Sequence, residues 1–348
     1  SKAHWDAPEL LAKTAIDTLK DLGWKSGNTL HLVLDDTQKR KRGKLMEAVS
    51  KIFLHAEKVY AQGHTIVACA IVYRNVVIPY AVRLWATTAF CKQTQKKSYD
   101  GQYVEFRKLT QLAAEIITDC PLKKVTVLFD SYYLCPNVPH ACAAKQYRWA
   151  GVAKKNRNFF PDGRDRDKRR LSSYGANTLK CLGKWVTHEG KKYRLAERVG
   201  RLSKLGRVKL VFSRRVKAKR WIAIATNETR WGALRVLRQY LNRWPIEVLF
   251  KESKQYVGLG DYQMLRYRGV VRYLHLVLIA HLLLTHLGGV AQGAQANDKN
   301  KPLDLPSVPQ LQLHLREKLW DDTINSMEKG TRNRRIGKKL KQLILLET

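Results

Sequence analysis

Short runs of apolar, β-branched and aromatic residues alternate along the chain with segments of helical spacing. The two clearest runs are 30–34 and 125–129, and both are bounded by polar residues. Runs of this length and composition predict buried strands. Asp35 follows the first run and Asp130 follows the second, so the pattern predicts two carboxylates at strand ends. Open α/β sheets carry their chemistry at that edge.

The remaining pattern predicts the elements around these strands. Apolar residues at helical spacing from 3 to 23 end at Gly23, which indicates a helix packed on the core. Two runs separated only by Arg74-Asn75 predict a β-hairpin. The predicted elements after the first strand are strands at 65–73, 76–85 and 149–153, helices at 102–118 and 141–147, and hairpin-like runs at 184–199 and 207–212.

A third acid lies downstream, among residues whose types and spacing suggest chemistry. Tyr240, Arg243, Glu247 and Lys254 follow one another as Tyr-(2)-Arg-(3)-Glu-(6)-Lys. At about 100° per residue, one continuous helix would carry all four side chains on one face. Such a face can hold a metal ion and grip phosphates. Pro245 disfavours helix at the residue before it, so a kink or the start of a new helix is the alternative.

Composition adds a strong electrostatic signal. The chain has 348 residues, of which 45% are hydrophobic, so it can bury a full core. It carries 65 Lys and Arg against 29 Asp and Glu, a formal net charge of +36. Such an excess is costly in self-repulsion unless a polyanion neutralises it, and a merely solvated surface needs only a few charges. The composition therefore predicts a nucleic-acid partner.

Much of this charge lies in one segment. Residues 157–220 hold 21 Lys or Arg against 5 Asp or Glu, a net +16. A charge run is usually a solvated loop, but here the excess extends over a β-rich segment, which favours a subdomain that grips DNA. The candidate phosphate contacts are Lys168, Arg169 and Arg170. Three tryptophans that could stack on an extruded base are interpreted as packing residues, namely Trp185, Trp221 and Trp231.

Cysteine spacing and hydropathy argue against other classes. The six cysteines show no paired Cys-x-x-Cys spacing, which predicts reduced thiols. A zinc site from Cys135, His140 and Cys142 is the alternative, but a fourth ligand and the usual spacing are missing. The most apolar stretch, 274–287, contains three histidines and is shorter than the ~20 residues that a membrane span requires. It predicts a buried helix and no membrane partner.

The last part of the chain predicts a linker and helices. Residues 288–309 are rich in Gly, Ala, Asn and Pro, which is typical of a linker. Beyond it, 311–320 and 334–345 are amphipathic. The basic stretch 332–341 could bind DNA on one face and a partner protomer on the other, and a soluble terminal helix is the equal alternative.

The two acids after strands and the Tyr-Arg-Glu-Lys spacing together resemble the DDE transposases of bacterial insertion sequences. The resemblance is to the branch that carries this motif, insertion-sequence family four and its relatives. The family's first acid, in an Asp-x-Thr step, is matched by Asp-Asp-Thr at 35–37, and its second acid by Asp-Ser-Tyr at 130–132. Residues 258–263 and the apolar helix after them also resemble the family, so the likeness covers about 28 to 290.

This resemblance implies an α/β fold with a ribonuclease-H-like catalytic domain and a β-rich insertion between the second and third acids. The predicted order of three strands, helix, strand, helix and strand agrees with it. The expected divisions are an N-terminal helical segment at 1–28, a first part of the core at 29–156, a basic β-rich insertion at 157–228, a second part of the core with the third acid at 229–288, and a linker with a basic helical tail at 289–348.

The resemblance also implies roles for individual residues. Asp35, Asp130 and Glu247 would be the catalytic acids that hold two Mg²⁺ or Mn²⁺ ions. Asp36 duplicates the first acid and is the alternate ligand if the alignment slips by one position. The motif residues expected at the DNA are Tyr240, Arg243 and Lys254.

The implied function is a transposase that cleaves transposon ends and joins the freed strand to target DNA. Its partners would be both double-stranded DNAs and a second copy of the chain, in a homodimer or larger assembly, in the bacterial cytoplasm with the nucleoid. Relatives usually have a longer N-terminal DNA-binding region, so we expect a piece of a longer protein. The alternatives are a domesticated, inactive relative that only binds DNA, and a structure-specific nuclease of the same fold.

Overall fold

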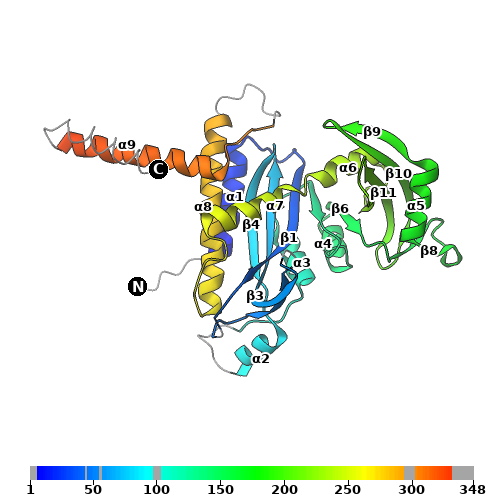
Figure 1. The fold of residues 1–348 in the computed structure, drawn as a ribbon, viewed down its shortest axis with the longest axis horizontal. Coiled ribbons are helices and arrows are strands. Elements are labelled where there is room, and N and C mark those ends of the chain that lie inside the picture. The colour runs from blue at the N-terminus through cyan, green and yellow to red at the C-terminus, as the bar shows by residue number, and fades with distance from the viewer. Residues whose placement is uncertain (1–5, 44, 55–56, 97–102, 294–301, 331–348) are drawn as a thin grey trace.

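The strands form one mixed sheet of twelve strands in the residues that the computed structural model describes, 6–43, 45–54, 57–96, 103–293 and 302–330 (Figure 1). Neighbours pair in the order β2-β3-β1-β5-β6-β12-β11-β10-β7-β8, with β4 beside β3 and β9 beside β10. The strands are β1 (Leu30–Arg40), β2 (Ser50–Leu54), β3 (Val59–Tyr73), β4 (Val76–Leu84), β5 (Val125–Phe129), β6 (Arg148–Ala153), β7 (Asn158–Phe160), β8 (Arg169–Arg170), β9 (Lys184–His188), β10 (Lys191–Leu202), β11 (Gly206–Arg215) and β12 (Ile222–Thr226).

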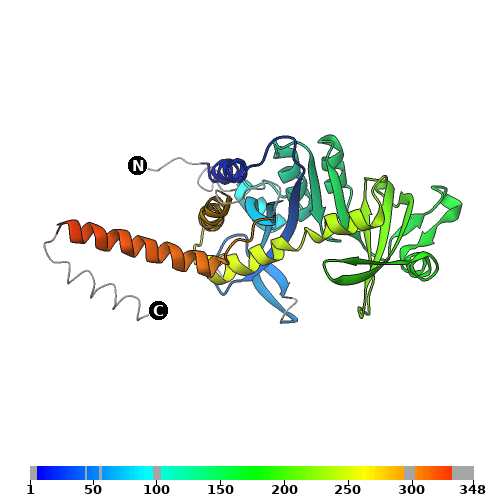
Figure 2. The same ribbon diagram turned by 90° about the horizontal axis from the view of Figure 1, so that it is seen from above.

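Helices cover the sheet and connect its strands. The α-helices are α1 (Ala7–Asp21), α2 (Thr88–Lys96), α3 (Leu109–Asp119), α4 (Asn137–Ala144), α5 (Leu171–Leu182), α6 (Ala233–Leu241), α7 (Pro245–Glu252), α8 (Tyr267–Gly293) and α9 (Val308–Gly330). α1 and α8 lie side by side and both pack on β4, while α7 crosses the strands near β1 (Figures 1 and 2). α9 extends away from the sheet. The fold is therefore mixed α/β.

The predicted first helix is confirmed. Asp6 caps α1, because its side chain accepts a hydrogen bond from the backbone N–H of Glu9 at 3.0 Å. Leu11 and Leu19 are fully buried against the core. The chain leaves the helix through Gly23, whose φ of +85° lies in the left-handed region that glycine adopts at little cost.

The predicted hairpin is also confirmed. β3 and β4 pair in antiparallel fashion, and Arg74 and Asn75 form the turn with φ of 51° and 69°. Positive φ at both central residues is the geometry that matches the twist of two-residue hairpins. β3 begins six residues earlier than predicted and pairs there with β2, a strand that the pattern did not reveal.

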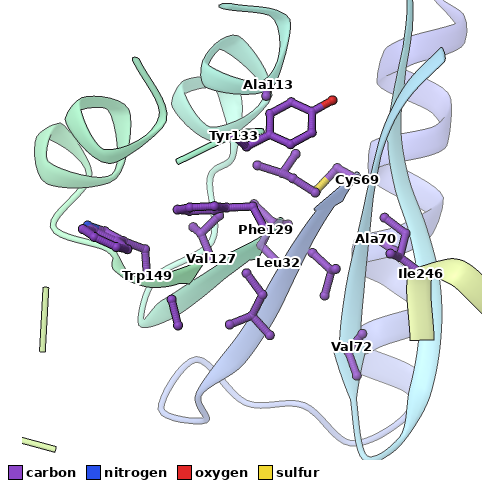
Figure 3. Close-up of a cluster of buried hydrophobic side chains, with 14 of the residues drawn as sticks. Leu32, Cys69, Ala70, Val72, Ala113, Val127, Phe129, Tyr133, Trp149 and Ile246 are labelled. Atoms are coloured by element: carbon purple, nitrogen blue, oxygen red, sulfur yellow. The ribbon is translucent and has the colours of Figure 1, made fainter. Parts of the chain in front are cut away.

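One part of the core gathers buried side chains of β1, β3, β5 and β6 (Figure 3). Leu32 and Val127 are buried on neighbouring parallel strands, as expected where both faces of a sheet are covered. Phe129 stacks on Trp149 with ring centroids 5.9 Å apart. Gly151 makes this packing feasible, because a Cβ there would lie 2.2 Å from the Phe129 ring.

The prediction that the first strand ends at Asp35 is wrong. β1 continues to Arg40, and its antiparallel pairing with β3 extends to Arg40 opposite Gly63. Its parallel pairing with β5, however, stops at Leu34 opposite Phe129. Asp35 therefore lies inside a strand because the long β3 continues to supply hydrogen-bond partners, yet it stands where the parallel ladder ends.

Several helix boundaries also differ from the prediction. The predicted helix at 102–118 begins only at Leu109, because the Gln111 side chain caps an extended Lys108. The helix predicted at 141–147 is α4, which starts and ends earlier, and α2 lies where no helix was predicted. α8 continues through the first residues of the predicted linker. The predicted segments 332–341 and 334–345 both lie within 331–348, outside the described residues.

α8 is the apolar helix that the sequence predicted at 274–287. By length and composition alone, Tyr267–Val290 could cross a membrane, but half of its most apolar stretch is buried within the protein. His275 and His281 are among its buried residues. A core helix of a globular protein meets the same criteria, and α8 packs on α1 and β4.

The predicted strands in the basic segment are present. The runs at 184–199 and 207–212 correspond to β9, β10 and β11, and β9 and β10 form a hairpin. These strands do not form a separate sheet, since β11 pairs with β12 and β12 pairs with β6. The expected division of the chain at 157 and 228 stays a prediction.

Candidate active site

Asp35 and Asp130 are neighbours across the two central parallel strands. The parallel pairing of β1 with β5 ends at Leu34 opposite Phe129, and the next residue in the sequence after each of these is an acid. The two carboxylates are close enough to interact electrostatically, since the charge of Asp130 contributes to raising the pKa of Asp35. The fold thus brings together two acids that are 95 positions apart in the sequence.

The Asp130 side chain is held by the turn that follows β5. Its Oδ1 accepts hydrogen bonds from the backbone N–H groups of Tyr132 at 2.8 Å and Tyr133 at 3.3 Å. An aspartate that bonds to the backbone two and three residues ahead shapes a tight turn. The turn fixes one carboxylate oxygen and thereby limits the directions in which the other can point.

Glu247 lies in the first turn of α7, which begins at Pro245. Ile246, Leu249 and Phe250 are buried and dock α7 on strands β1, β3 and β4. An acid in the first turn of a helix is stabilised by the positive end of the helix dipole. Packing of the apolar face therefore fixes on the sheet the helical turn that carries Glu247.

Arg243 joins two of the three acids. Its Nη1 donates to Asp35 Oδ2 at 2.8 Å, and its Nη2 donates to Glu247 Oε1. The side chain is 15% exposed, so these charge-assisted hydrogen bonds are shielded from solvent. The guanidinium carbon also lies 5.9 Å from the centre of the Tyr240 ring. Three of the four motif residues thus meet beside Asp35.

Asp35 is held in an environment that disfavours its charge. Burial raises its pKa to about 7, the nearby Arg243 guanidinium opposes this shift, and the charges of Asp130 and Asp36 add to it. The side chain is 18% exposed. A carboxyl group with such a pKa, beside a second acid in a partly closed site, is typical of a functional position that takes up a cation.

Asp36 has different partners from Asp35. Its Oδ1 accepts a hydrogen bond of 3.0 Å from the hydroxyl of Tyr133, a residue that is fully buried. Successive side chains of a strand point to opposite faces of the sheet, which separates the two adjacent acids. The structure gives Asp35 the contact with Arg243 and gives Asp36 the contact with Tyr133.

The four motif residues do not lie on one continuous helix, and the structure has the alternative in which Pro245 starts a new helix. α6 ends at Leu241, α7 begins at Pro245, and Lys254 lies in a π-helical turn, Ser253–Val257, closed by Gly258 with φ of +86°. Proline cannot donate to the helical ladder, so Pro245 starts a new helix, and the π turn changes the register after it.

Lys254 therefore lies away from the other three motif residues. Its Nζ donates to the backbone carbonyl of Gln38 at 3.0 Å, three residues beyond Asp35 on β1. Burial lowers its pKa, and the nearby Lys39 charge adds to this effect. The bond ties the π-helical turn after α7 to β1, a role that helical spacing alone could not reveal.

The three acids have the donor chemistry of a site for Mg²⁺ or Mn²⁺, which prefer carboxylate oxygens. Within the described residues, however, no group of three or more His, Cys, Asp or Glu side chains is arranged to hold a metal ion. Arg243 is the cation that contacts Asp35 and Glu247 instead. Asp35, partly buried beside Asp130, has the type of oxygen ligand that a divalent ion binds, and Arg243 would have to release its contacts with Asp35 and Glu247 for an ion to bind there.

The predicted DNA contacts in the basic segment are remote from the acids. Lys168, Arg169 and Arg170 are exposed, and β8 is the last strand in the sheet order. Trp231 is buried, and Trp221 packs on Phe212, which agrees with their interpretation as packing residues. Trp185 is instead exposed.

The alternative zinc site does not form among the described residues, which hold no such cluster. His140 is exposed on α4, whereas Cys142 on the same helix is buried. All six cysteines are free thiols, and four of them are buried, as expected for small core residues.

The sequence pattern missed a buried lysine that links β1 to the segment after α7. Lys41 Nζ donates to the carbonyls of Gly260 and Tyr262, both at 2.7 Å, and lies 3.3 Å from the centre of the Tyr262 ring. The Tyr262 hydroxyl bonds to His64 Nδ1 at 2.7 Å, and Lys39 pairs with Asp261. The only sign of these contacts in the sequence was the motif at 258–263. Its partners at the end of β1 and on β3 become known only from the fold.

Comparison with known proteins gives one family. A family model described as DDE superfamily endonuclease matches residues 1–202. The matched part includes Asp35, Asp36 and Asp130 and ends before Glu247. A comparison with curated proteins finds no match.

Proposed function

Because the chain belongs to the DDE superfamily endonuclease family, we propose that it is a DNA transposase that cuts transposon ends and joins the freed strand to target DNA. The observation that carries the proposal is the placement of Asp35 beside Asp130 where the parallel pairing of β1 with β5 ends, with Arg243 joining Asp35 to Glu247. The Tyr-Arg-Glu-Lys spacing supports the branch of insertion-sequence transposases that the sequence resembles.

We propose a ribonuclease-H-like core for this chain, with a DNA-gripping insertion at 157–228. The parallel pair β1 and β5, flanked by antiparallel β3 and by parallel β6, supports the proposed core. The strands of the basic segment lengthen the sheet on the side opposite β2. Their positive charge would bind the part of the DNA that extends from the acids toward this end of the sheet.

Asp35, Asp130 and Glu247 are proposed to hold two Mg²⁺ or Mn²⁺ ions. When bound, these ions would help to activate the attacking water and to stabilise the leaving 3′-oxygen. The protein contributes carboxylates fixed by strand pairing, by the turn after β5 and by the docking of α7. Arg243, relieved of its contacts with the acids, would bind a phosphate beside the cut, with Tyr240 against its guanidinium.

The proposed partners follow from charge and from the chemistry. A net charge of +36 suits a protein that neutralises many phosphates of transposon-end and target DNA. Joining two DNA ends requires at least two active sites, so a homodimer or larger assembly on DNA is proposed. The proposed location is the bacterial cytoplasm, with the nucleoid.

The test is a paired assay of cutting and joining. The purified chain is mixed with supercoiled plasmid and a labelled duplex that ends in a free 3′-hydroxyl, with and without Mg²⁺. Metal-dependent nicking and transfer of the label to the plasmid support the proposal, and Asp130→Ala and Glu247→Ala should lose both. Nicking without transfer would instead indicate a nuclease, and DNA binding without either reaction an inactive relative.

A further inference from the structure

A two-stranded ribbon projects from the sheet near the end of β1. It consists of β2 and the first part of β3, paired from Ser50 opposite Gly63 to Leu54 opposite Val59. β2 is the edge strand of the sheet order. Figure 2 shows the ribbon extending from the side of the sheet on which α6 and α7 lie. We call residues 50–54 and 59–63 the aromatic ribbon.

The aromatic ribbon has one buried side and one exposed side. Ile52 is buried, which anchors the ribbon to the protein. On the other side, Phe53 and Tyr60 stand opposite each other with ring centroids 5.0 Å apart, and Lys51 Nζ lies 4.7 Å from the centre of the Tyr60 ring. Contact with Phe53 leaves Tyr60 67% exposed. Packing of the ribbon on the protein therefore accounts for an apolar residue at Ile52. It does not account for an aromatic ring at Tyr60 that faces solvent beside Lys51.

The surroundings of this exposed side are basic. The exposed cations on and next to the ribbon are Arg40, Arg42, Lys51 and Lys58. The exposed acid in the same region is Glu57, which pairs with Arg40 at 3.5 Å. A basic surface with an exposed aromatic ring is the combination that binds a polyanion with sugars and bases, and the major groove of duplex DNA admits a two-stranded ribbon.

The ribbon lies within reach of DNA at the acids. Arg40 is five residues beyond Asp35 on β1, which corresponds to about 17 Å along the strand. Duplex DNA rises about 3.4 Å per base pair, so this distance is about five base pairs. The backbone N–H of Lys41 bonds to the carbonyl of Gln62 at 2.8 Å, which joins the end of β1 directly to the ribbon.

From these relationships we infer that the aromatic ribbon binds the backbone and groove of duplex DNA about five or more base pairs from the cut. Lys51 contacts a phosphate, and the exposed ring of Tyr60 packs against the sugars and base edges of the groove. The inference rests on the proposed function, because it takes DNA at the acids as its starting point. It adds a second contact region, on the side of the acids opposite the basic segment 157–220.

The test compares single-charge variants of the full chain on a labelled duplex longer than two helical turns, without divalent metal, over a series of salt concentrations. Lys51→Gln should flatten the dependence of log affinity on log salt by about 0.9, which is about an eightfold loss at 0.1 M salt relative to 1 M. Tyr60→Ala should lower affinity by about three- to tenfold with little change in slope, because the ring carries no charge.

The matched control is Lys123→Gln, which removes one exposed charge just before β5, at the end of that strand away from Asp130. It should leave slope and affinity unchanged. Both ribbon residues are exposed, and thermal melting of each variant verifies folding. Wild-type affinity and slope in Lys51→Gln and Tyr60→Ala would overturn the inference while leaving the proposed function intact. If the ribbon variants lost self-association but kept their DNA affinity, the ribbon inference would also be overturned. If the wild-type chain failed to bind duplex DNA, both the ribbon inference and the proposed function would be overturned.

Discussion

The hydroxyl of Tyr133 donates a 3.0 Å hydrogen bond to Asp36, whereas Asp35, its neighbour in the sequence, binds Arg243. Tyr133 is fully buried and follows the turn that Asp130 forms. The bond therefore ties the first acid-bearing strand to the loop after the second. Asp35, on the opposite face, is left to Arg243.

This arrangement predicts different outcomes for the two acids. Asp35→Ala should reduce Mg²⁺-dependent cleavage by at least about 1000-fold, or about 4 kcal/mol of transition-state stabilisation, because it removes a metal ligand. Asp36→Ala should retain most of its cleavage rate and lose stability instead. Single-turnover cleavage and thermal unfolding measure the two effects. Active Asp35→Ala together with inactive Asp36→Ala would move the first ligand by one position.

Tyr133→Phe should destabilise the protein by about 1–3 kcal/mol, because it leaves a partly buried carboxylate without one donor. Cleavage at saturating metal should remain within about tenfold of wild type, an effect below about 1.4 kcal/mol. Tyr132→Phe is the matched control, since this neighbouring ring is exposed. Equal melting temperatures for the two variants would show that the Tyr133 bond contributes nothing to stability.

Asp35 should make the metal-free protein less stable as pH rises. Its pKa is about 7 in the folded protein against 3.8 for the free side chain, so the folded state binds the proton more tightly. The resulting stabilisation is fully present below about pH 4 and is lost as pH rises through about 7, an effect on the order of 4 kcal/mol. Asp35→Asn, which stays neutral, should therefore be more stable than wild type above pH 7 and similar to it near pH 4.

Denaturant unfolding across this pH range, with a chelator present, measures the difference. Asp17→Asn, on the exposed part of α1, is the control for loss of an acid elsewhere. If the difference between Asp35→Asn and wild type were constant with pH, Asp35 would not be the group that titrates.

The basic segment should dominate the salt dependence of DNA binding. Contacts with six to eight phosphates correspond to a slope of log affinity against log salt of about −5 to −7. Replacing Lys168, Arg169 and Arg170 by Gln should flatten this slope by as much as about 2 to 3 units if all three contact phosphate. Fluorescence anisotropy on a labelled duplex provides the measurement. Unchanged slope and affinity would place the DNA on another surface.

Lys254 should matter for cleavage more than its exposed neighbour does. Lys254→Ala removes the bond to the Gln38 carbonyl that fixes the π-helical turn after α7 on β1, and we expect cleavage to slow by about 10- to 1000-fold, or about 1.4 to 4 kcal/mol. The control is Lys251→Ala, which removes an exposed lysine three residues earlier and should leave the cleavage rate near that of wild type. Wild-type kinetics for Lys254→Ala at saturating DNA and metal would exclude both a phosphate contact and a positioning role.

Local pattern was sufficient for the elements whose stability is local. The entry of the chain into α1, the Arg74-Asn75 hairpin and the strand before Asp130 all follow from caps, turn residues and apolar runs that act within a few positions. The sequence also nominated the three acids, two from the ends of apolar runs and Glu247 from motif spacing, and their catalytic role stays a prediction.

What the sequence could not determine depends on partners far along the chain. β1 passes Asp35 because β3 continues to pair with it, and Lys254 turns to Gln38 because a proline and a π turn change the helical register. Hydrogen bonds between distant segments leave no periodic trace in the sequence. By itself the sequence nominated the residues for the chemistry and placed Arg243 four positions before Glu247. The tertiary structure decided that Arg243 also reaches Asp35, because only the docking of α7 on β1 brings these distant charges within bonding distance.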